Sequence, residues 1–435
     1  MADARAVAMR ALVALELGQA PRLRDALDTR TLPPRDQAFA FELAHGVLRR
    51  ERLLDHVLLG LAHRGLPEDP RLVAALRLGA YQLTFVPGMP THAAVHATVQ
   101  IVRNNKGFAN AVLRGIARAI VDGPVADERR DLALGPTRVL RLARPLPDDE
   151  ALRLAVVHSL PDFLVQRWVA AFGIEAARQI AAAASATPGV FLRVAATRQP
   201  AALAAELTAA GVEVATTAHE RMLRWSGGSS PFATAAFRDG AFVVQDPTAA
   251  AAAAALPCGP GDVVVDLCAA PGTKTTALAE RVRPGGRVFA FDVDAARRQR
   301  IAENVARLHL GDVVQIVDDA GALPRADAVL ADVPCSNSGV LARRVEVRRR
   351  LQPSTFADLV PLQRRLLAQA LTLSKPGGVV LYSTCSIDPE ENDGVVDAVL
   401  ADGATPRATV ESRCLTLPKA GECDGGWFAL LRRHA

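Results

Sequence analysis

The chain has 435 residues, of which 50% are hydrophobic and 22% are charged, and its net charge is +5. This length exceeds one ordinary hydrophobic core, so we expect two or three domains. No stretch approaches the roughly 20 consecutive apolar residues of a membrane span, and charged residues interrupt the N-terminal positions where a signal peptide needs an apolar core. We therefore expect a cytoplasmic protein. The six cysteines lack zinc-finger spacing and are too few for a disulfide framework, so we expect no metal site.

The first 120 residues are predicted to form helices. Apolar residues recur every three or four positions from Phe39 to Leu61 and from Leu72 to Leu83, and clusters of proline and glycine separate these runs. Lys and Arg outnumber Asp and Glu here, whereas the rest of the chain is nearly neutral. A basic helical domain suits a polyanionic partner, although a solvated basic face explains the excess nearly as well. We assign an all-α domain to residues 1–135, with a linker to about residue 150.

The middle of the chain, residues 151–240, is predicted to be a small α+β unit. Helical stretches between Leu164 and Ala184 and from Pro200 to Ala210 alternate with strands from Val190 to Val194 and from Val212 to Ala215.

Residues 241–435 alternate strands and helices, which indicates an α/β domain of the Rossmann-like type. The first five strands are nearly continuous apolar runs, as in a parallel sheet that is covered on both faces. The expected strands are Val263 to Leu267, Arg287 to Phe291, Val313 to Val317, Ala328 to Ala331, Val379 to Tyr382 and Trp427 to Leu431.

A loop of small residues follows the first of these strands and opens a helix. A strand, a tight loop and a helix N-terminus together present backbone N–H groups to a ligand at the carboxyl edge of the sheet. Thr273 stands where a Walker loop needs glycine before its lysine, and no Gly-x-Gly-x-x-Gly pattern is present. We predict a cofactor loop of another kind, with an ordinary turn as the alternative. Its residues are Cys268, Ala269, Ala270, Pro271, Gly272, Thr273 and Lys274.

Acidic residues follow the next two strands. Asp292 ends the second strand, where a carboxylate can bind both ribose hydroxyls of a nucleoside, whereas the competing Asp294 is expected to lie in the following helix. Asp318 and Asp319 end the third strand, and we favour Asp319 as the carboxylate near an adenine amino group. Each acid alone could be a helix cap. Acids in register at successive strand ends indicate a nucleoside site.

Two cysteines lie directly after predicted strands. Cys335 follows the fourth strand within Asp332-Val-Pro-Cys-Ser, and Cys385 follows the fifth within Ser383-Thr-Cys-Ser. Both are thus expected at the edge of the sheet that carries the cofactor loop. A thiolate there can act as a nucleophile, and nearby cations lower its pKa. For Cys258, Cys414 and Cys423, a small buried side chain is the simpler interpretation.

The cofactor loop and both cysteine segments carry a resemblance to a known family. Asp266 to Thr276, Asp332 to Ser336 and Tyr382 to Asn392 resemble the motifs of the NOL/NOP/Sun family of RNA cytosine-C5 methyltransferases. In the N-terminal part, segments such as Gly46 to Arg49 and Gly79 to Leu83 resemble the NusB-like domain. The combination is similar to the bacterial 16S rRNA methyltransferases of the Sun/RsmB type, over nearly the whole chain. It implies an RRM-like middle unit and a class I methyltransferase domain.

The resemblance implies a reaction and roles for four residues. S-adenosylmethionine is the implied cofactor, and a cytosine of 16S rRNA, naked or in a small-subunit assembly intermediate, is the implied substrate. Cys385 attacks C6 of the base, Cys335 assists release, and Lys274 positions groups or favours a thiolate. Asp332 binds the N3/N4 edge and is also expected among the cofactor-binding residues. Simple pairing with a carboxylate is the alternative for Lys274. Two other functions stay open, a tRNA cytosine-C5 methyltransferase and an inactive RNA-binding factor. We expect a monomer.

The sequence departs from the family pattern after the first cysteine. The usual Pro-Asp is missing from Arg343-Arg-Val-Glu, and Arg349 or Arg350 stands where tryptophan is common. The arginine cluster from Arg343 to Arg350 suits contacts to RNA phosphates, or else is a solvated charge run. His92 and His96 lie one helical turn apart but have no third ligand in pattern, so we interpret them as surface or packing residues.

Overall fold

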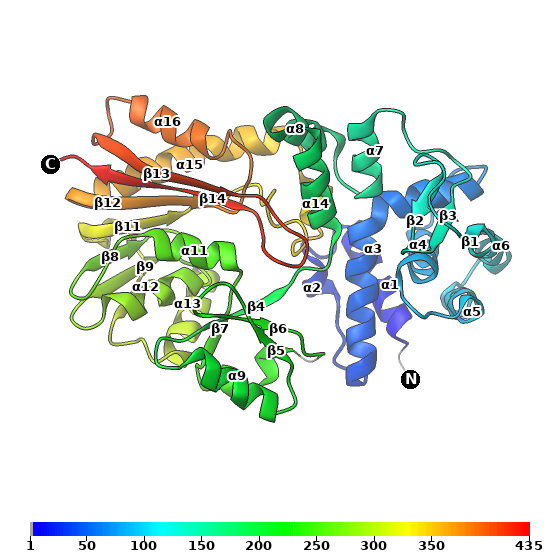
Figure 1. The fold of residues 1–435 in the computed structure, drawn as a ribbon, viewed down its shortest axis with the longest axis horizontal. Helices are drawn as coiled ribbons and strands as arrows, with labels where there is room; N and C mark the ends of the chain where they lie inside the picture. Colours follow the sequence, from blue (N-terminus) through cyan, green and yellow to red (C-terminus); the bar gives the residue numbers. More distant parts are fainter. Residues whose placement is uncertain (1–2, 229) are drawn as a thin grey trace. The chain divides into compact units, whose positions relative to one another are not determined.

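The structure is a computed structural model that describes residues 3–228 and 230–435. It divides into two compact units (Figure 1), one formed by Met1–Ser185 with Arg344–Leu351 and the other by Ala186–Arg343 with Gln352–Ala435. A short segment of the C-terminal half thus belongs to the N-terminal unit. In the part of the chain described here, no helix combines the length and apolar character of a membrane span.

The first unit is built on helices that pack through small residues. Gly46 of α3 leaves room for the ring of Tyr81 on α4, because a Cβ at Gly46 would lie 2.0 Å from that ring. The Tyr81 hydroxyl donates to Glu42 of α3 over 2.5 Å, so a hydrogen bond also joins these two helices. The helical prediction for this region is therefore confirmed. The helices are α1 (Ala4–Glu16), α2 (Leu23–Ala26), α3 (Pro34–Leu61), α4 (Pro70–Phe85), α5 (Thr91–Ile101) and α6 (Lys106–Ala119).

The segment expected as an irregular linker contains a small antiparallel sheet. Its strands β1 (Ile120–Asp122), β2 (Asp131–Ala133) and β3 (Arg138–Arg141) are ordered β1-β3-β2. Two further helices follow, α7 (Glu150–Val157) and α8 (Asp162–Ser185), and both lie in the first unit.

This placement differs from the expected boundary near residue 151. The turn after α7 is tied to α3, where Ser159 Oγ accepts a hydrogen bond from the backbone N–H of Leu53 over 3.1 Å. Long-range packing of this kind leaves no periodic signal in the sequence, so the boundary could not be seen there.

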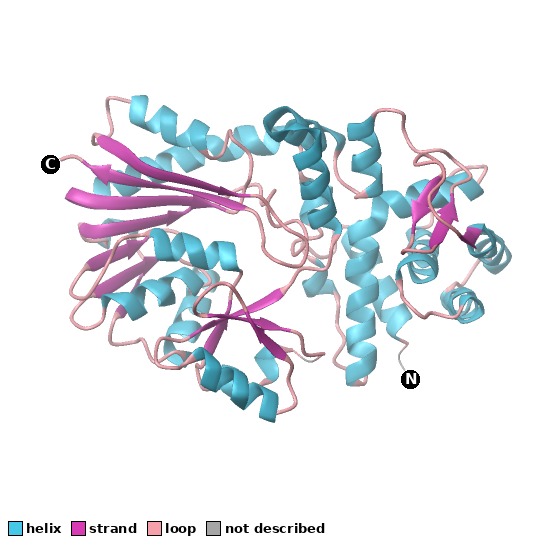
Figure 2. Ribbon diagram, in the orientation of Figure 1, coloured by secondary structure: helices cyan, strands magenta, loops and turns pink. Residues whose placement is uncertain are grey.

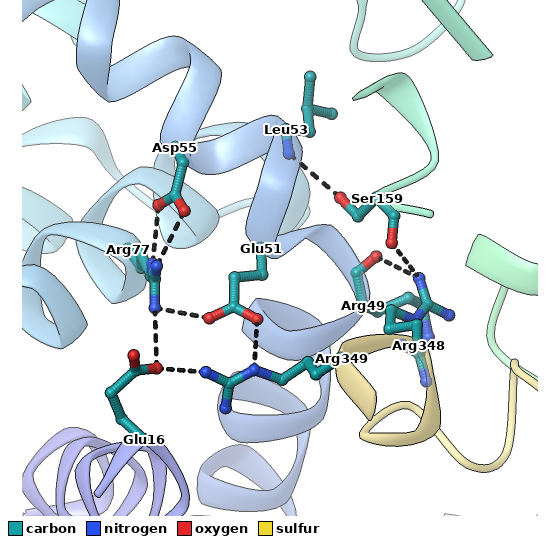
Figure 3. A network of polar contacts seen from close by, with 9 residues as sticks. All are labelled: Glu16, Arg49, Glu51, Leu53, Asp55, Arg77, Ser159, Arg348 and Arg349. Atoms are coloured by element: carbon teal, nitrogen blue, oxygen red, sulfur yellow. Dashed lines mark hydrogen bonds and ion pairs between the residues drawn. The ribbon is translucent and has the colours of Figure 1, made fainter. Parts of the chain in front are cut away.

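The segment from Arg344 to Leu351, with α14 (Val347–Arg350), completes the first unit (Figure 3). Arg348 is only 5% exposed. Its guanidinium donates to the backbone carbonyls of Arg49 and Ala184 over 2.9 and 2.7 Å, and to those of His158 and Ser159 over 3.1 and 3.4 Å. Burial, together with Arg49 and Arg50, lowers the pKa of Arg348 to about 9, which leaves it charged at neutral pH.

Arg349 joins a network of ion pairs in the same unit (Figure 3). It pairs with Glu16 and, over 3.2 Å, with Glu51. Arg77 pairs with Glu51 over 2.6 Å and with Asp55 over 2.7 Å. The expectation that Arg348 contacts RNA phosphates is therefore wrong, because its guanidinium is buried among carbonyls, whereas Arg349 is exposed and paired with carboxylates.

The second unit begins with a small antiparallel sheet. Its strands β4 (Val190–Val194), β5 (Val214–Thr216), β6 (Met222–Trp225) and β7 (Phe242–Val244) are ordered β5-β6-β4-β7, and α9 (Pro200–Ala209) crosses between β4 and β5. Strands β6 and β7 were not predicted, and β7 lies beyond the expected end of this unit at residue 240. The 3-10 helix η1 (Pro231–Ala233) and α10 (Ala235–Arg238) precede β7.

The rest of this unit is a seven-stranded mixed sheet between helices (Figure 2). The strand order is β10-β9-β8-β11-β12-β14-β13; strands β8 to β12 pair in parallel, whereas β14 pairs antiparallel with both β12 and β13. Consecutive residues Val264 and Val265 of β8 belong to different hydrophobic clusters, so both faces are buried. The strands are β8 (Val263–Asp266), β9 (Arg287–Phe291), β10 (Val314–Val317), β11 (Ala326–Asp332), β12 (Ser374–Thr384), β13 (Ala408–Thr416) and β14 (Gly426–Arg433). The helices are α11 (Pro247–Ala255), α12 (Thr273–Val282), α13 (Ala295–Arg307), α15 (Pro353–Leu373) and α16 (Asp393–Ala401), with the 3-10 helix η2 (Ala320–Ala322) after β10.

The predicted Rossmann-like α/β fold is confirmed, and all six expected strands are present. The sequence analysis missed β13. This strand lies at the edge of the sheet and is largely exposed, so it lacks the apolar run that marked the others.

Candidate active site

The five parallel strands bring the predicted site residues to one edge of the large sheet. Strands β8, β9, β10, β11 and β12 run in the same direction, so the loops at their carboxyl ends lie together. These loops carry Cys268 to Lys274, Asp292, Asp319, Asp332 and Cys385.

The loop after β8 combines a left-handed glycine with a buried acid. Gly272, with φ of 98°, turns the chain into α12, where an L side chain would be strained. Asp266, at the end of β8, is 1% exposed, and its Oδ2 accepts from Thr275 Oγ1 over 2.7 Å. Its Oδ1 is buried without a hydrogen-bond partner among the described residues. Burial raises the pKa of Asp266 to about 7.

Asp266 received no role of its own in the sequence analysis. The sequence nevertheless marks Asp266 as a candidate ligand of the cofactor, because it is an acid at the end of an apolar strand and directly before the cofactor loop. A buried carboxylate oxygen without a partner is costly unless a ligand satisfies it.

The two acids after β9 have different environments. Asp292 is 3% exposed, and one of its oxygens accepts from Ala270 N in the cofactor loop over 3.2 Å. Arg297 lies 3.4 Å from the same carboxylate. Asp294 is instead the N-cap of α13, where it accepts from the first turn. Asp292 is therefore the acid that is joined to the loop.

The two acids after β10 are both exposed. Asp319 caps η2, and its Oδ1 accepts from Gly321 N over 2.9 Å. Its other oxygen takes no part in that cap, so Asp319 is anchored with one oxygen and can still present the other.

Lys274 and Asp332 form an ion pair at the carboxyl end of β11. Lys274 Nζ lies 2.6 Å from Asp332 Oδ2, and Ser383 Oγ donates to Asp332 Oδ1 over 2.6 Å. Burial lowers the pKa of Lys274, but the ion pair with Asp332 outweighs it and the pKa lies above its ordinary value. The Asp332 side chain remains 31% exposed, so a further donor can reach it.

The two predicted cysteines are neighbours. Cys335 Sγ lies 3.0 Å from Cys385 Sγ, and Cys385 Sγ lies 3.3 Å from Asn337 Oδ1. The hydrogen bond with Cys385, burial and the charge on Glu391 raise the pKa of Cys335 well above its ordinary value. Negative charge on Cys385 is a further cause of the raised pKa of Lys274.

A buried acid, Glu391, supports the loop of Cys335. It is 0% exposed and accepts from the backbone N–H and the hydroxyl of Ser336, over 2.8 and 2.5 Å. Gln363 Nε2 donates to Glu391 over 2.9 Å and to the carbonyl of Pro334 over the same distance. Glu391 lies within the motif from Tyr382 to Asn392, and only the fold shows that it joins the two cysteine loops.

The remaining cysteines and histidines take other positions. Cys268 is in the cofactor loop, and burial raises the pKa of its thiol far above the ordinary value, so it is no nucleophile at neutral pH. His92 and His96 lie exposed on α5. Within residues 3–228 and 230–435, no cluster of three His, Cys, Asp or Glu side chains could hold a metal ion.

Arg343 is also structural rather than free for RNA. Its guanidinium donates to Asp246 over 2.8 Å, to Asp424 over 2.5 Å and to the carbonyl of Gly189 over 2.8 Å. This corrects the expectation that it contacts phosphates, while Arg344 and Arg350 remain exposed.

Comparison with known proteins gives the family. Residues 253–420 match the family described as 16S rRNA methyltransferase RsmB/F, and residues 2–118 match the NusB family. The solved structure of PH0851 shares the fold over 98% of this chain and 99% of its own, with a TM-score of 0.75 at 24% identity. That of a methyltransferase homologue from Pyrococcus horikoshii covers 66% of this chain and 98% of its own, with a TM-score of 0.56 at 26% identity.

Curated relatives are similar over almost the whole chain. The ribosomal RNA small subunit methyltransferase B of Thermus thermophilus is 32% identical over 99% of this chain and 97% of its own length. The probable ribosomal RNA small subunit methyltransferase B of Bacillus subtilis is 31% identical over 92% of this chain and 88% of its own. The chain therefore belongs to the RsmB/F family of 16S rRNA methyltransferases and carries a domain of the NusB family in its N-terminal part.

Proposed function

We propose that this protein transfers a methyl group from S-adenosylmethionine to C5 of a cytosine in 16S rRNA, through a covalent bond between Cys385 and C6 of the base. The observation that carries the proposal is the cysteine pair, with sulfurs 3.0 Å apart, at the same sheet edge as the Lys274–Asp332 ion pair and the cofactor loop. The names of the curated relatives support ribosomal RNA, rather than tRNA, as the substrate.

The residues at the sheet edge fit S-adenosylmethionine. Asp266 offers a buried carboxylate oxygen that has no partner among the described residues, and Asp292 is a nearly buried acid at the end of the next strand. Such acids suit the amino and ribose hydroxyl groups of the cofactor. When bound, the cofactor supplies an electrophilic methyl group. The solved structure of NSun6 from Pyrococcus horikoshii contains SFG, an analogue of this cofactor, which supports the same site here.

A nucleophilic cysteine is needed because cytosine C5 is a poor nucleophile. Addition of the Cys385 thiolate to C6 breaks the C5=C6 double bond and moves its electron pair to C5, which can then take the methyl group. The family resemblance assigns the attack to Cys385 and leaves Cys335, 3.0 Å away, to assist. The nearby cation of Lys274 favours the thiolate of Cys385.

Product release needs the reverse bond change. A solvent water takes the C5 proton, the C5=C6 double bond re-forms and the bond between Cys385 and C6 breaks. The thiol of Cys335, 3.0 Å from the leaving sulfur, donates to the departing Cys385 thiolate and so assists this step. The partly exposed Asp332 accepts a hydrogen bond from the amino group at the N3/N4 edge. A paired base inside a helix cannot reach these groups, so the target cytosine is unstacked or in a loop.

Two single variants test the roles of the cysteines. Each variant is incubated with RNA and with S-adenosylmethionine that is labelled in its methyl group. Cys385→Ala should form neither a protein–RNA adduct nor a methylated product. Cys335→Ala should attack and methylate but release slowly, so that a labelled protein–RNA adduct survives denaturing electrophoresis. The double variant should show no adduct. If the adduct appeared with Cys385→Ala instead, Cys335 would be the attacking residue and Cys385 would assist release. If no adduct appeared with either single variant, the covalent route would be contradicted.

The same label separates the alternative functions. Incorporation into isolated 16S rRNA or small-subunit particles, but not into tRNA, is expected, and mapping the base should give 5-methylcytosine. Transfer to tRNA alone, or no transfer at all with intact cofactor binding, would favour the tRNA enzyme or the inactive RNA-binding factor respectively.

A further inference from the structure

Asn337 connects the two cysteines through both ends of its side-chain amide. Its Nδ2 donates to the carbonyl oxygen of Cys335 over 2.8 Å, and its Oδ1 lies 3.3 Å from Cys385 Sγ. A carbonyl oxygen can only accept hydrogen bonds, so the contact with Cys335 determines which end of the amide faces Cys385. The end that faces the sulfur is the acceptor.

The backbone holds this side chain in place. Asn337 has φ of 62°, in the left-handed region, which asparagine tolerates better than most residues. Its carbonyl accepts from Val340 N over 3.1 Å, which closes the turn that follows. The amide is thus part of a fixed turn between the cysteine and the rest of the loop.

Counting protons gives the direction of the contact between the sulfurs. Each thiol has one proton. If Cys385 donates its proton to Asn337 Oδ1, then in the 3.0 Å contact between the sulfurs Cys335 must be the donor. The thiol of Cys335 then donates to Cys385 Sγ, and the thiol of Cys385 donates to Asn337 Oδ1.

We propose that Asn337 is a positioning residue for Cys385: its Oδ1 orients the sulfur and holds the proton of the resting thiol on the side away from Cys335. This rests on the proposed function, in which Cys385 is the nucleophile. When Cys385 loses its proton, the S–H of Cys335 still points at the charged sulfur and stabilises it. Asn337 therefore favours the neutral thiol, and Cys335 favours the thiolate.

Other ionisable groups surround the cysteine pair and form a constant background. Lys274, on α12, interacts with Cys385 and pairs with Asp332 at the end of β11, whereas Glu391, before α16, acts on Cys335. Cys335 faces Cys385 Sγ from the loop after β11. A substitution at Asn337 leaves all four in place, so its effect on Cys385 can be attributed to the amide.

Two substitutions in the full chain should move the ionisation of Cys385 in opposite directions. Asn337→Gly keeps the left-handed backbone and removes the acceptor, so the pH of half-maximal alkylation of Cys385 by iodoacetamide should fall by roughly half a unit to one unit. Asn337→Asp keeps an acceptor and adds a negative charge, so this midpoint should rise by about 1–3 units. Peptide mass spectrometry measures the alkylation of Cys385 separately from the other thiols.

Asn105 is a matched control. It has φ of 61°, is exposed, and forms no side-chain cap at the start of α6. Asn105→Gly and Asn105→Asp should leave the Cys385 midpoint unchanged. Identical midpoints in wild type and both Asn337 variants would overturn the proposal, as would shifts of both in the same direction.

Adduct formation with RNA is measured separately with Cys335→Ala, the variant in which the adduct should accumulate. Opposite shifts in the alkylation of the Asn337 variants, without any adduct in Cys335→Ala, would refute the proposed function and support the role of Asn337 at the thiol. An RNA adduct with unshifted midpoints would support the function and refute the role of Asn337.

Discussion

Replacement of Arg348 distinguishes a structural arginine from an RNA contact. The structure gives its guanidinium two short hydrogen bonds, to the carbonyls of Ala184 and Arg49 at 2.7 and 2.9 Å, with 5% exposure. Arg348→Ala leaves both carbonyls buried without this donor, which costs about 1–3 kcal/mol each. The substitution also removes the cost of burying a charge, so we expect a net loss of about 2–4 kcal/mol.

The loss should be visible in the first unit. For a folding unit of this size, a loss of about 2–4 kcal/mol lowers the melting temperature by roughly 4–16 °C. Differential scanning calorimetry measures the shift, and hydrogen exchange should increase in α3 and α8, which carry the two carbonyls.

Arg350 is the control, because it is exposed and lies two residues away. Arg350→Ala should change stability by no more than about 0.5 kcal/mol. If Arg348→Ala melted like wild type but bound RNA more weakly, with a smaller salt dependence, Arg348 would be a phosphate contact after all and the structural reasoning would fail.

Three further results are expected for the cofactor and RNA sites. Asp292→Ala should weaken S-adenosylmethionine binding roughly tenfold or more in calorimetry, since a charged hydrogen-bond pair contributes about 1.5–3 kcal/mol, and unchanged affinity would move the ribose site elsewhere. Because burial raises the pKa of Asp266 to about 7, the carboxylate is protonated below and charged above that pH, so cofactor affinity should rise from pH 6 to 8; Asp266→Asn should abolish the rise. Changing the exposed Arg103, Lys106 and Arg114 to glutamine should weaken RNA binding and reduce its salt dependence. An unchanged salt series would leave α6 and the loop before it without an RNA role.

The sequence predicted the large sheet and its reactive edge because both depend on local signals. Apolar runs marked β8 to β12, and chemically distinctive residues such as Cys335 and Cys385 followed them. The assignment of attack to Cys385 came from the family resemblance. The hydrogen bonds of Asn337 and Glu391 join segments about 50 residues apart, and no pattern along the chain encodes such pairs.

The arginine cluster shows where sequence reasoning from charge fails. A run of arginines has the same composition whether it contacts phosphate, carboxylate or carbonyl groups. The structure shows carboxylate and carbonyl partners for Arg343, Arg348 and Arg349. These partners are distant in sequence, so the run of arginines does not reveal them.

The path of the chain also bears on how the role of the NusB-family domain can be tested. The N–H of Gly339 donates to the carbonyl of Cys385 over 3.0 Å. Only four residues lie between Gly339 and the segment Arg344–Leu351, which belongs to the first unit. Val345 of that segment lies in the hydrophobic core of the first unit, and Arg348 binds its carbonyls. Deleting the domain would therefore expose this segment as well as remove a basic surface. Loss of activity on truncation would be expected even if the domain never touched RNA, so substitution of exposed side chains in the full chain is the experiment that separates the two.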